Sequence, residues 1–219
     1  MKLDNDMTTR TRVKICGLTS VDDVQTVVNA GADAVGFVFY EPSPRHVDIE
    51  QATELAKKVP AFVTKTALFV DPEIEYIEQV LASVDIDLLQ FHGSETAEFC
   101  EQIAQRFGKS YIKAVRMQAD TDLHALSQSY SGSAGLLLDA YVAGVPGGTG
   151  EQFNWDWIPS SLTKPVILAG GLNADNVSDA IAKVTPWAVD VSGGVELSKG
   201  IKSPEKIQQF IKKVMGTVE

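Results

Sequence analysis

The chain has 219 residues, of which 44% are hydrophobic, and a formal net charge of -10. This apolar content excludes an intrinsically disordered chain, and the negative charge excludes nucleic acid as an expected partner because phosphate backbones repel an acidic surface. No apolar run approaches the ~20 residues of a membrane-spanning helix, so no membrane partner is expected.

The N-terminal residues are polar and lack the apolar core of a signal peptide. We therefore expect a flexible tail at residues 1–11, a single domain at residues 12–216 and a cytoplasmic location. The two cysteines, Cys16 and Cys100, are too few for a disulfide framework. No CxxC or HExxH spacing indicates a metal site.

Eight short apolar runs follow one another along the chain and are predicted to be β-strands. They are continuous stretches of Val, Ile, Leu and Phe rather than alternating ones, which is typical of parallel strands buried on both faces. The runs are residues 12–16, 34–39, 66–70, 87–91, 111–115, 135–139, 165–169 and 188–192.

The segments between these runs have the apolar spacing of helices. Helix start signals occur at Ser20, at the pair Asp71 and Pro72, and at Ser203 before a proline. The sixth unit differs, because a long glycine-rich segment follows the strand there and only residues 154–158 indicate a short helical piece.

Eight strand–helix repeats at roughly 27 residues each predict an α/β protein, a single-domain (β/α)8 TIM barrel of the phosphate-binding type. The competing arrangement is an open doubly wound sheet, which usually has a G-x-G-x-x-G sequence after its first strand. No such sequence follows residues 12–16, and the barrel is therefore favoured.

Active sites of such barrels lie at the carboxyl ends of the strands, and phosphate binds at the loops after strands seven and eight. Glycine pairs stand at both places, Gly170 and Gly171 in one loop and Gly193 and Gly194 in the other. Glycine lets backbone N–H groups approach phosphate oxygens closely. One pair alone is more often a tight turn, but both together favour a phosphate site that includes Gly171, Leu172, Gly193 and Gly194.

Cys16 and Asp139 end the first and sixth apolar runs. A cysteine in this position is more often a small buried hydrophobic residue than a catalytic one. Burial of Asp139 would favour the neutral form of its carboxyl group, which could then give up a proton. The alternative is that Asp139 caps the following loop or forms an ion pair with it. Together the two residues are candidates for a base and an acid that face each other across the barrel mouth.

Other polar residues lie near the same strand ends. His92 is predicted to be a substrate-binding residue with a supporting polar role rather than a catalytic one. Arg45 could capture a carboxylate with its forked guanidinium, or could be a solvated surface residue. Lys14 lies on the same side of its strand as Cys16 and is predicted to form an ion pair with Asp190 inside the barrel, because an unpaired interior charge is costly.

Taken in order, these segments resemble the phosphoribosylanthranilate isomerase family. The matching segments are residues 13–18, 36–39 with 43–45, 89–93, 138–139 with 147–150, 168–172 and 190–196. Each segment alone is unspecific, but the ordered set, which spans residues 12–214, is highly specific. The chain departs from the family at Gly193, where serine is commoner, and at Lys199, where the family more often has proline before the glycine.

The resemblance implies an Amadori rearrangement in tryptophan biosynthesis. N-(5-phosphoribosyl)anthranilate would become 1-(2-carboxyphenylamino)-1-deoxyribulose 5-phosphate. It implies that Asp139 is the general acid, that Cys16 is the general base and that Arg45 holds the anthranilate carboxylate. The loops at Gly171 and at Gly193 and Gly194 would hold the phosphate. No metal or organic cofactor is implied, because the substrate nitrogen serves as the electron sink.

Three other functions are weighed against this one. The aminoimidazole ribotide isomerases of histidine synthesis use aspartate where this chain has Cys16. Indole-glycerol-phosphate synthases use lysines and have an N-terminal extension. A non-catalytic barrel that binds a phosphorylated ligand would keep the glycine loops but has no reason to keep both Cys16 and Asp139. The sequence leaves the oligomeric state open, with a monomer as the working expectation.

Overall fold

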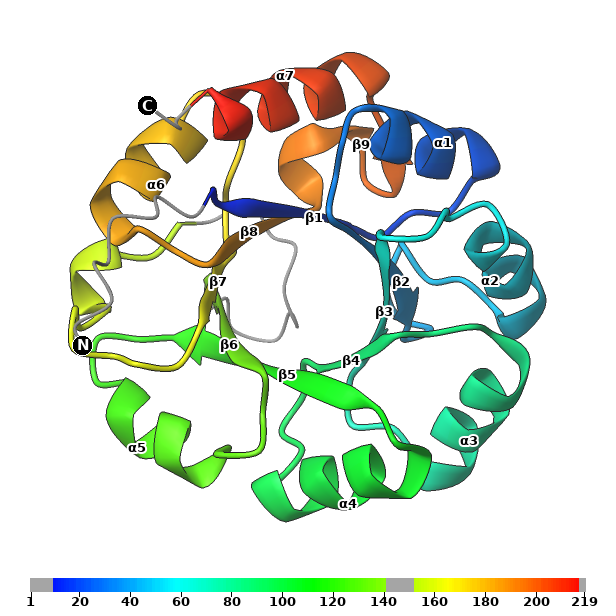
Figure 1. Ribbon diagram of the computed structural model, residues 1–219, viewed down its shortest axis with the longest axis horizontal. Helices are drawn as coiled ribbons and strands as arrows, with labels where there is room; N and C mark the ends of the chain where they lie inside the picture. Colours follow the sequence, from blue (N-terminus) through cyan, green and yellow to red (C-terminus); the bar gives the residue numbers. More distant parts are fainter. Residues whose placement is uncertain (1–9, 141–151, 217–219) are drawn as a thin grey trace, which may run out of the picture.

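Eight parallel strands form a closed barrel in the order β1 to β8 (Figure 1). The structure, a computed structural model, describes residues 10–140 and 152–216. The strands are β1 (Arg12–Cys16), β2 (Ala34–Phe39), β3 (Thr64–Phe69), β4 (Leu88–Phe91), β5 (Ser110–Met117), β6 (Gly135–Ala140), β7 (Val166–Leu168) and β8 (Ala188–Val191). Because β8 pairs with β1, the ring is closed and the predicted (β/α)8 barrel is confirmed.

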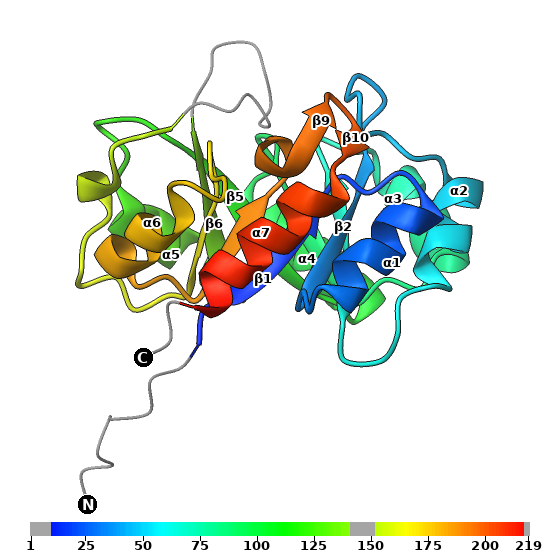
Figure 2. The ribbon, with the colours of Figure 1, turned by 90° about the horizontal axis from the view of Figure 1, so that it is seen from above.

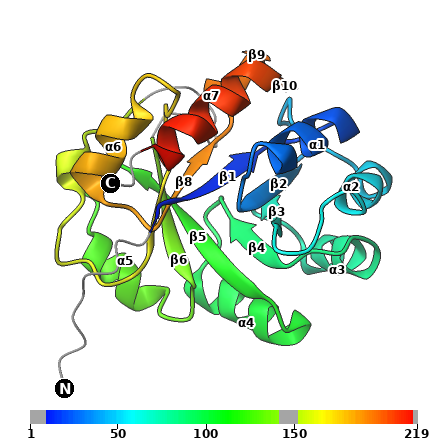
Figure 3. The same cartoon turned by 45° about the horizontal axis from the view of Figure 1, so that its top comes forward.

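Helices surround the barrel on the outside (Figure 1). They are α1 (Val21–Asn29), α2 (Ile49–Ala56), α3 (Ile74–Ser83), α4 (Ala97–Phe107), α5 (Leu123–Ser129), α6 (Val177–Val184) and α7 (Pro204–Met215). Figure 3 shows α7 between α1 and α6, which it contacts on both sides. No helix within residues 10–140 and 152–216 is both long and apolar enough to cross a bilayer.

The helical piece of the sixth unit is short, as predicted. The described part of this unit contains the 3-10 helix η1 (Trp155–Trp157) in place of a full α-helix. The side chain of Asn154 caps η1 by accepting a hydrogen bond from the backbone N–H of Asp156.

The helix start signals are confirmed at two of the three predicted places. Ser20 and Ser203 each accept a hydrogen bond from a backbone N–H in the first turn of their helices. The predicted start at Asp71 is wrong, since α3 begins at Ile74. The reason is that the Asp71 carboxylate instead accepts hydrogen bonds from the backbone N–H and the hydroxyl of Ser94 in the next loop.

Apart from β1 and β2, the strand ends differ from the predicted ones by one or two residues. β3 begins at Thr64 rather than at residue 66, because the Thr64 N–H continues the ladder by donating to the Asp33 carbonyl. β5 extends to Met117 and β7 is shorter than predicted. A short hairpin that the sequence did not predict follows η2 (Gly193–Val195), with strands β9 (Glu196–Ser198) and β10 (Ile201–Lys202). Figure 2 shows this hairpin beyond the carboxyl end of β8.

Apolar side chains form one large core between the barrel and the helices and a smaller one inside the barrel. The inner core contains Ile112, Ala114, Leu137, Ile167, Ala169 and Ala188. Lys14 and Asp190 also lie inside, 4% and 8% exposed, with Nζ 2.9 Å from Oδ1. The predicted ion pair is confirmed, and it joins the first strand to the last.

We expect Lys14→Met to lower the free energy of unfolding by about 3–5 kcal/mol, because it leaves the Asp190 carboxylate buried without its cation. Urea denaturation at pH 7 measures this loss. The double variant Lys14→Met with Asp190→Leu serves as the control, since it removes both charges and should recover most of the stability. A single variant as stable as the wild type would contradict the expectation.

Candidate active site

Cys16 and Asp139 point into the barrel at the carboxyl ends of their strands. Side chains alternate along a strand, so Cys16 lies on the same face as Lys14, and Asp139 lies on the same face as Leu137 of the inner core. Burial by itself would lower the pKa of Arg45, but the hydrogen bond to Glu196 and the charge of that residue outweigh it, with lesser contributions from Cys16 and Asp139, and raise that pKa. Arg45 therefore lies within electrostatic reach of both Cys16 and Asp139.

The Cys16 thiol is buried and free. Gly36 makes room for it, because a Cβ at position 36 would lie 2.9 Å from the Cys16 Sγ and 3.2 Å from the Lys14 Nζ. Burial raises the pKa of the Cys16 thiol, and the lowering by the Lys14 and Lys202 charges does not overcome it. The protein alone therefore favours the thiol, and a positive charge on a bound ligand would be needed to favour the thiolate.

Asp139 is buried and held on both oxygens. Its Oδ1 accepts a hydrogen bond of 2.9 Å from the Ala140 N–H, and its Oδ2 lies 3.2 Å from the His92 Nε2. The Gln90 Nε2 lies 3.0 Å from the His92 Nδ1. Because the Gln90 amide donates a hydrogen bond to Nδ1, the imidazole carries its proton on Nε2. That N–H then donates a hydrogen bond to the Asp139 Oδ2. His92 thus orients the Asp139 carboxyl group.

Arg45 is 8% exposed and is not a solvated surface residue. Its Nε donates to the Glu196 Oε1 over 2.7 Å, and its Nη2 donates to the Glu196 Oε2 over 2.9 Å. The forked guanidinium is therefore bound to a carboxylate of the chain itself. The sequence prediction named Arg45 but missed this partner.

The two candidate phosphate loops are in direct contact. A Cβ at position 194 would lie 1.8 Å from the Leu172 carbonyl oxygen, so only glycine fits there. In the first loop, the Asn176 Nδ2 donates to the Gly171 carbonyl. Gly193 begins η2, separated by one residue from the end of β8. The structure thus brings Gly171, Leu172, Gly193 and Gly194 together, while residues 147–150 of the sequence comparison lie outside the described residues.

Two buried ion pairs near the mouth were missed from the sequence. The fully buried Lys202 Nζ donates to the Glu196 Oε1 over 2.8 Å. On the other side, Lys113 pairs with Glu95 over 3.1 Å, and Glu95 also accepts from the Gly93 N–H beside His92. A carboxylate directly after a glycine loop was the one available signal for Glu196, and nothing in the sequence pattern marked Lys202 or the Lys113 pair.

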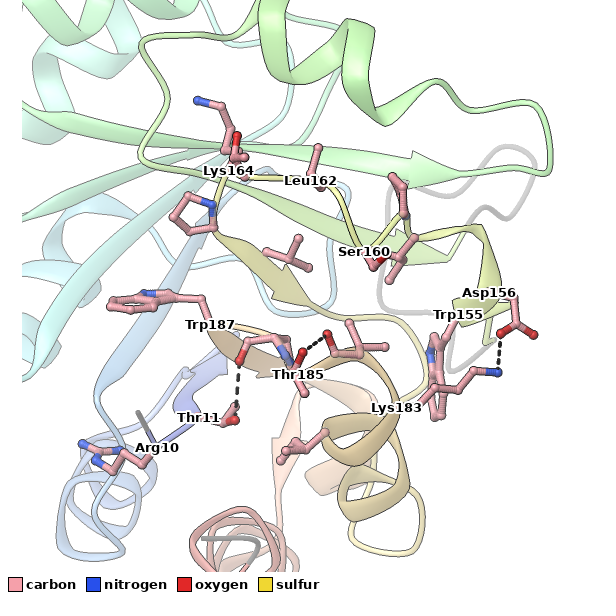
Figure 4. Close-up of a pocket in the computed structure, with 18 residues that line it drawn as sticks. Arg10, Thr11, Trp155, Asp156, Ser160, Leu162, Lys164, Lys183, Thr185 and Trp187 are labelled. Carbon is pink, nitrogen blue, oxygen red and sulfur yellow. Dashed lines mark hydrogen bonds and ion pairs between the residues drawn. The ribbon is translucent and has the colours of Figure 1, made fainter. Parts of the chain in front are cut away.

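A cavity of about 1020 Å³ lies at the opposite end of the barrel. Figure 4 shows Trp155, Lys183, Thr185 and Trp187 around it, with Lys183 paired to Asp156 over 2.8 Å. Its space arises where η1 replaces a full helix beside α6. Active sites of these barrels lie at the carboxyl ends of the strands, so this cavity is not the candidate active site.

No group of three His, Cys, Asp or Glu side chains that could hold a metal ion occurs in the described part of the chain.

Arg10, at the edge of the cavity beside Trp187, hydrogen-bonds to Asp33. Arg10 and Thr11 belong to the predicted tail at residues 1–11, and residues 1–9 lie outside the described residues.

The closed barrel and the residues at the carboxyl ends of its strands define a (β/α)8-barrel enzyme. Its candidate active site contains a thiol, a carboxyl group and an arginine. A family model described as N-(5'phosphoribosyl)anthranilate (PRA) isomerase matches residues 13–213. The chain belongs to the N-(5'-phosphoribosyl)anthranilate isomerase family. Membership makes it an intramolecular isomerase of tryptophan biosynthesis.

Curated relatives match almost the whole chain. The N-(5'-phosphoribosyl)anthranilate isomerase of Alcanivorax borkumensis is 55% identical over 210 residues, which cover 93% of this chain and 94% of that protein. The enzyme of the same name from Thiobacillus denitrificans is 54% identical over 200 residues, with 91% and 96% of the two chains covered. Similarity of this extent supports the same fold and the same family throughout the barrel.

Solved structures of this family are similar to the chain. The phosphoribosyl anthranilate isomerase from Thermus thermophilus has a TM-score of 0.84 at 30% identity, with 94% of this chain and 99% of that chain covered. The enzyme from Thermotoga maritima has a TM-score of 0.82 at 38% identity with the same coverage. Another solved isomerase, with a TM-score of 0.79 and 37% identity over 94% of this chain and 99% of that one, is in complex with reduced 1-(o-carboxyphenylamino)-1-deoxyribulose 5-phosphate.

Proposed function

We propose that the enzyme converts N-(5-phosphoribosyl)anthranilate into 1-(2-carboxyphenylamino)-1-deoxyribulose 5-phosphate by an Amadori rearrangement, with Asp139 as the general acid and Cys16 as the general base. The observation that carries the proposal is that both side chains point into one mouth, where Arg45 interacts electrostatically with each of them. A buried acid and a buried base at the same end of the barrel are what the two proton transfers of this isomerisation need.

The first step opens the ribose ring. Asp139 gives a proton to the ring oxygen while the bond between that oxygen and C1′ breaks. The electron pair of the anthranilate nitrogen then forms a double bond to C1′, which leaves a positively charged iminium. The hydrogen bond from the His92 Nε2 holds the Asp139 carboxyl group in place for this transfer.

In the second step the Cys16 thiolate removes the C2′ proton. The electrons of the C2′–H bond form the C1′–C2′ double bond, and the iminium nitrogen takes up the displaced pair. The resulting enolamine then becomes the ketone by moving a proton from the C2′ hydroxyl to C1′. Because burial raises the pKa of the thiol, the iminium charge supplies the attraction that favours the thiolate.

The substrate is anionic at both ends, and each end has its own set of residues. Arg45 and the loops at Gly171, Leu172, Gly193 and Gly194 would hold the carboxylate and the phosphate respectively. The solved relative that binds a reduced carboxyphenylamino deoxyribulose phosphate supports this substrate class. We further propose that the enzyme acts without metal or cofactor as a cytoplasmic monomer, with residues 12–216 as its one domain.

A coupled assay tests the function. Anthranilate and phosphoribosyl pyrophosphate are converted to the aminoaldose by a separate transferase, and loss of its fluorescence reports the isomerase. The variant with both Cys16→Ala and Asp139→Asn is the control, and it should leave the fluorescence unchanged. Turnover of aminoimidazole ribotides in place of the anthranilate compound would contradict the proposal and favour the histidine-pathway alternative.

We expect Arg45→Ala to raise KM for the anthranilate compound by about 10- to 100-fold, because a hydrogen bond to a charged group contributes roughly 1.5–3 kcal/mol. The effect on kcat should be smaller, since the carboxylate is held equally before and during the reaction. Steady-state kinetics of Arg45→Ala and Arg45→Lys measure both constants. An unchanged KM in the alanine variant would place the carboxylate site elsewhere.

A further inference from the structure

Glu196 is the centre of a buried charge cluster that the proposed chemistry does not use. Its two carboxylate oxygens accept from the Arg45 Nε and Nη2, and Oε1 also accepts from the Lys202 Nζ over 2.8 Å. Burial alone would raise the pKa of Glu196, but Arg45 and Lys202 together bring it below its ordinary value. Glu196 is therefore a carboxylate between two cations.

The cluster extends to the candidate catalytic residue and to the phosphate loop. Lys202 also donates to the Ser192 carbonyl over 3.1 Å, and the Ser192 hydroxyl donates to the Cys16 carbonyl over 3.0 Å. Ser192 directly precedes Gly193 and Gly194. A single connected set of bonds thus joins the proposed carboxylate-binding arginine to the backbone of the proposed phosphate site.

Packing also restricts the position of the Arg45 side chain. Its stem lies over Gly17, where a Cβ would come within 2.6 Å of the Arg45 Cδ. The loop before it is held by the β9–β10 hairpin, because a Cβ at Gly200 would lie 2.5 Å from the Pro44 carbonyl oxygen. Glu196 begins that hairpin. The β9–β10 hairpin, through Glu196, consequently determines the direction of the Arg45 guanidinium.

We propose that Glu196 is a positioning residue, which holds the Arg45 guanidinium in the direction that contacts the carboxylate of the substrate. This inference rests on the proposed function, since it assigns a cause to the placement of a proposed binding residue. A purely structural carboxylate would neutralise Arg45 and Lys202 without influencing which substrate is preferred. A positioning carboxylate acts on substrates that carry a carboxyl group and not on those that lack it.

The test compares two substrates, phosphoribosylanthranilate and N-(5-phosphoribosyl)aniline, which lacks the carboxyl group. The measured quantity is the ratio of their kcat/KM values, because any effect on the phosphate loop or on proton transfer cancels in it. We expect Glu196→Gln to lower this ratio by at least about tenfold, since a displacement of the order of 1 Å in a positioned group can cost about 10²-fold. The double variant Arg45→Ala with Glu196→Gln should have the same ratio as Arg45→Ala alone.

Glu196→Gln leaves two buried cations without a counter-charge, so a second variant guards against loss of folding. Glu196→Gln combined with Lys202→Met removes one charge of each sign and should lower the ratio equally. Asp33→Asn is the matched control, because it removes another carboxylate that pairs with an arginine, Arg10, at the other end of the barrel. We expect the control to keep the wild-type ratio.

The outcomes separate the inference from the function on which it rests. Wild-type protein that converts neither substrate overturns the proposed function itself. Wild-type protein that converts both with equal kcat/KM shows that Arg45 does not read the carboxylate, and the inference fails with it. A high wild-type ratio that Glu196→Gln and its double variant both keep overturns the inference alone.

Discussion

Asp139→Asn is expected to lower kcat by about 10² to 10⁴, which is the usual contribution of a positioned general acid. The amide has the size of the carboxyl group and keeps an oxygen that can accept from Ala140, as Oδ1 does now. It has no acidic proton to give to the ring oxygen, so ring opening would lose its catalyst. The coupled fluorescence assay, run at saturating substrate, measures the loss.

His92→Asn is the control for this variant. It removes the group that lies 3.2 Å from the Asp139 Oδ2 but leaves the acid itself, so we expect a smaller loss, of about tenfold in kcat. Near wild-type turnover in Asp139→Asn would remove Asp139 from the acid role. A larger loss in His92→Asn than in Asp139→Asn would transfer that role to the imidazole.

Cys16→Ala should also lower kcat by about 10² to 10⁴, because no other group would accept the C2′ proton. The substitution is small, and the Lys14–Asp190 pair beside it keeps both partners. A second readout comes from pH. Since burial raises the pKa of the Cys16 thiol and only the thiolate accepts a proton, wild-type kcat should increase with pH through the neutral range. A kcat that decreases over this range would contradict the assignment.

Cys100→Ala is the matched control for the thiol. Cys100 is also buried and free, but it lies on the α4 helix, and burial raises its pKa to about 12. It is therefore a thiol at every working pH and an apolar core residue in effect. We expect this variant to keep wild-type kcat and to lose only stability, which denaturant unfolding would measure.

The barrel could be predicted from the sequence because its strands are buried on both faces and therefore read as continuous apolar runs. The bounds of β1 and β2 were predicted to the residue. The Lys14–Asp190 pair was predictable from closure alone, since strands one and eight must be neighbours in a ring. The start of α3 was not, because the Asp71 side chain makes its hydrogen bonds to Ser94 in the following loop, which no local pattern records.

The mouth was predicted less completely. Cys16, Asp139 and His92 stand at strand ends, and Arg45 lies in the loop after β2, so all four could be named from position. The partners of Arg45 could not, because Glu196 and Lys202 lie on a hairpin that has only three and two residues in its strands. Such short strands carry no periodicity. Arg45 was thus assigned an external carboxylate, whereas its internal partner is brought to it by a hairpin that contacts the loops after β1 and β2.

The seam between β1 and β8 has a consequence for how activity arises. The Lys14–Asp190 bond and the Ser192–Cys16 bond both join residues that are 176 positions apart. Contacts of such wide separation carry a loop-closure cost and are slow to form. Turnover therefore requires that β8 has paired with β1, because the backbone of the proposed base, Cys16, is held across that pairing.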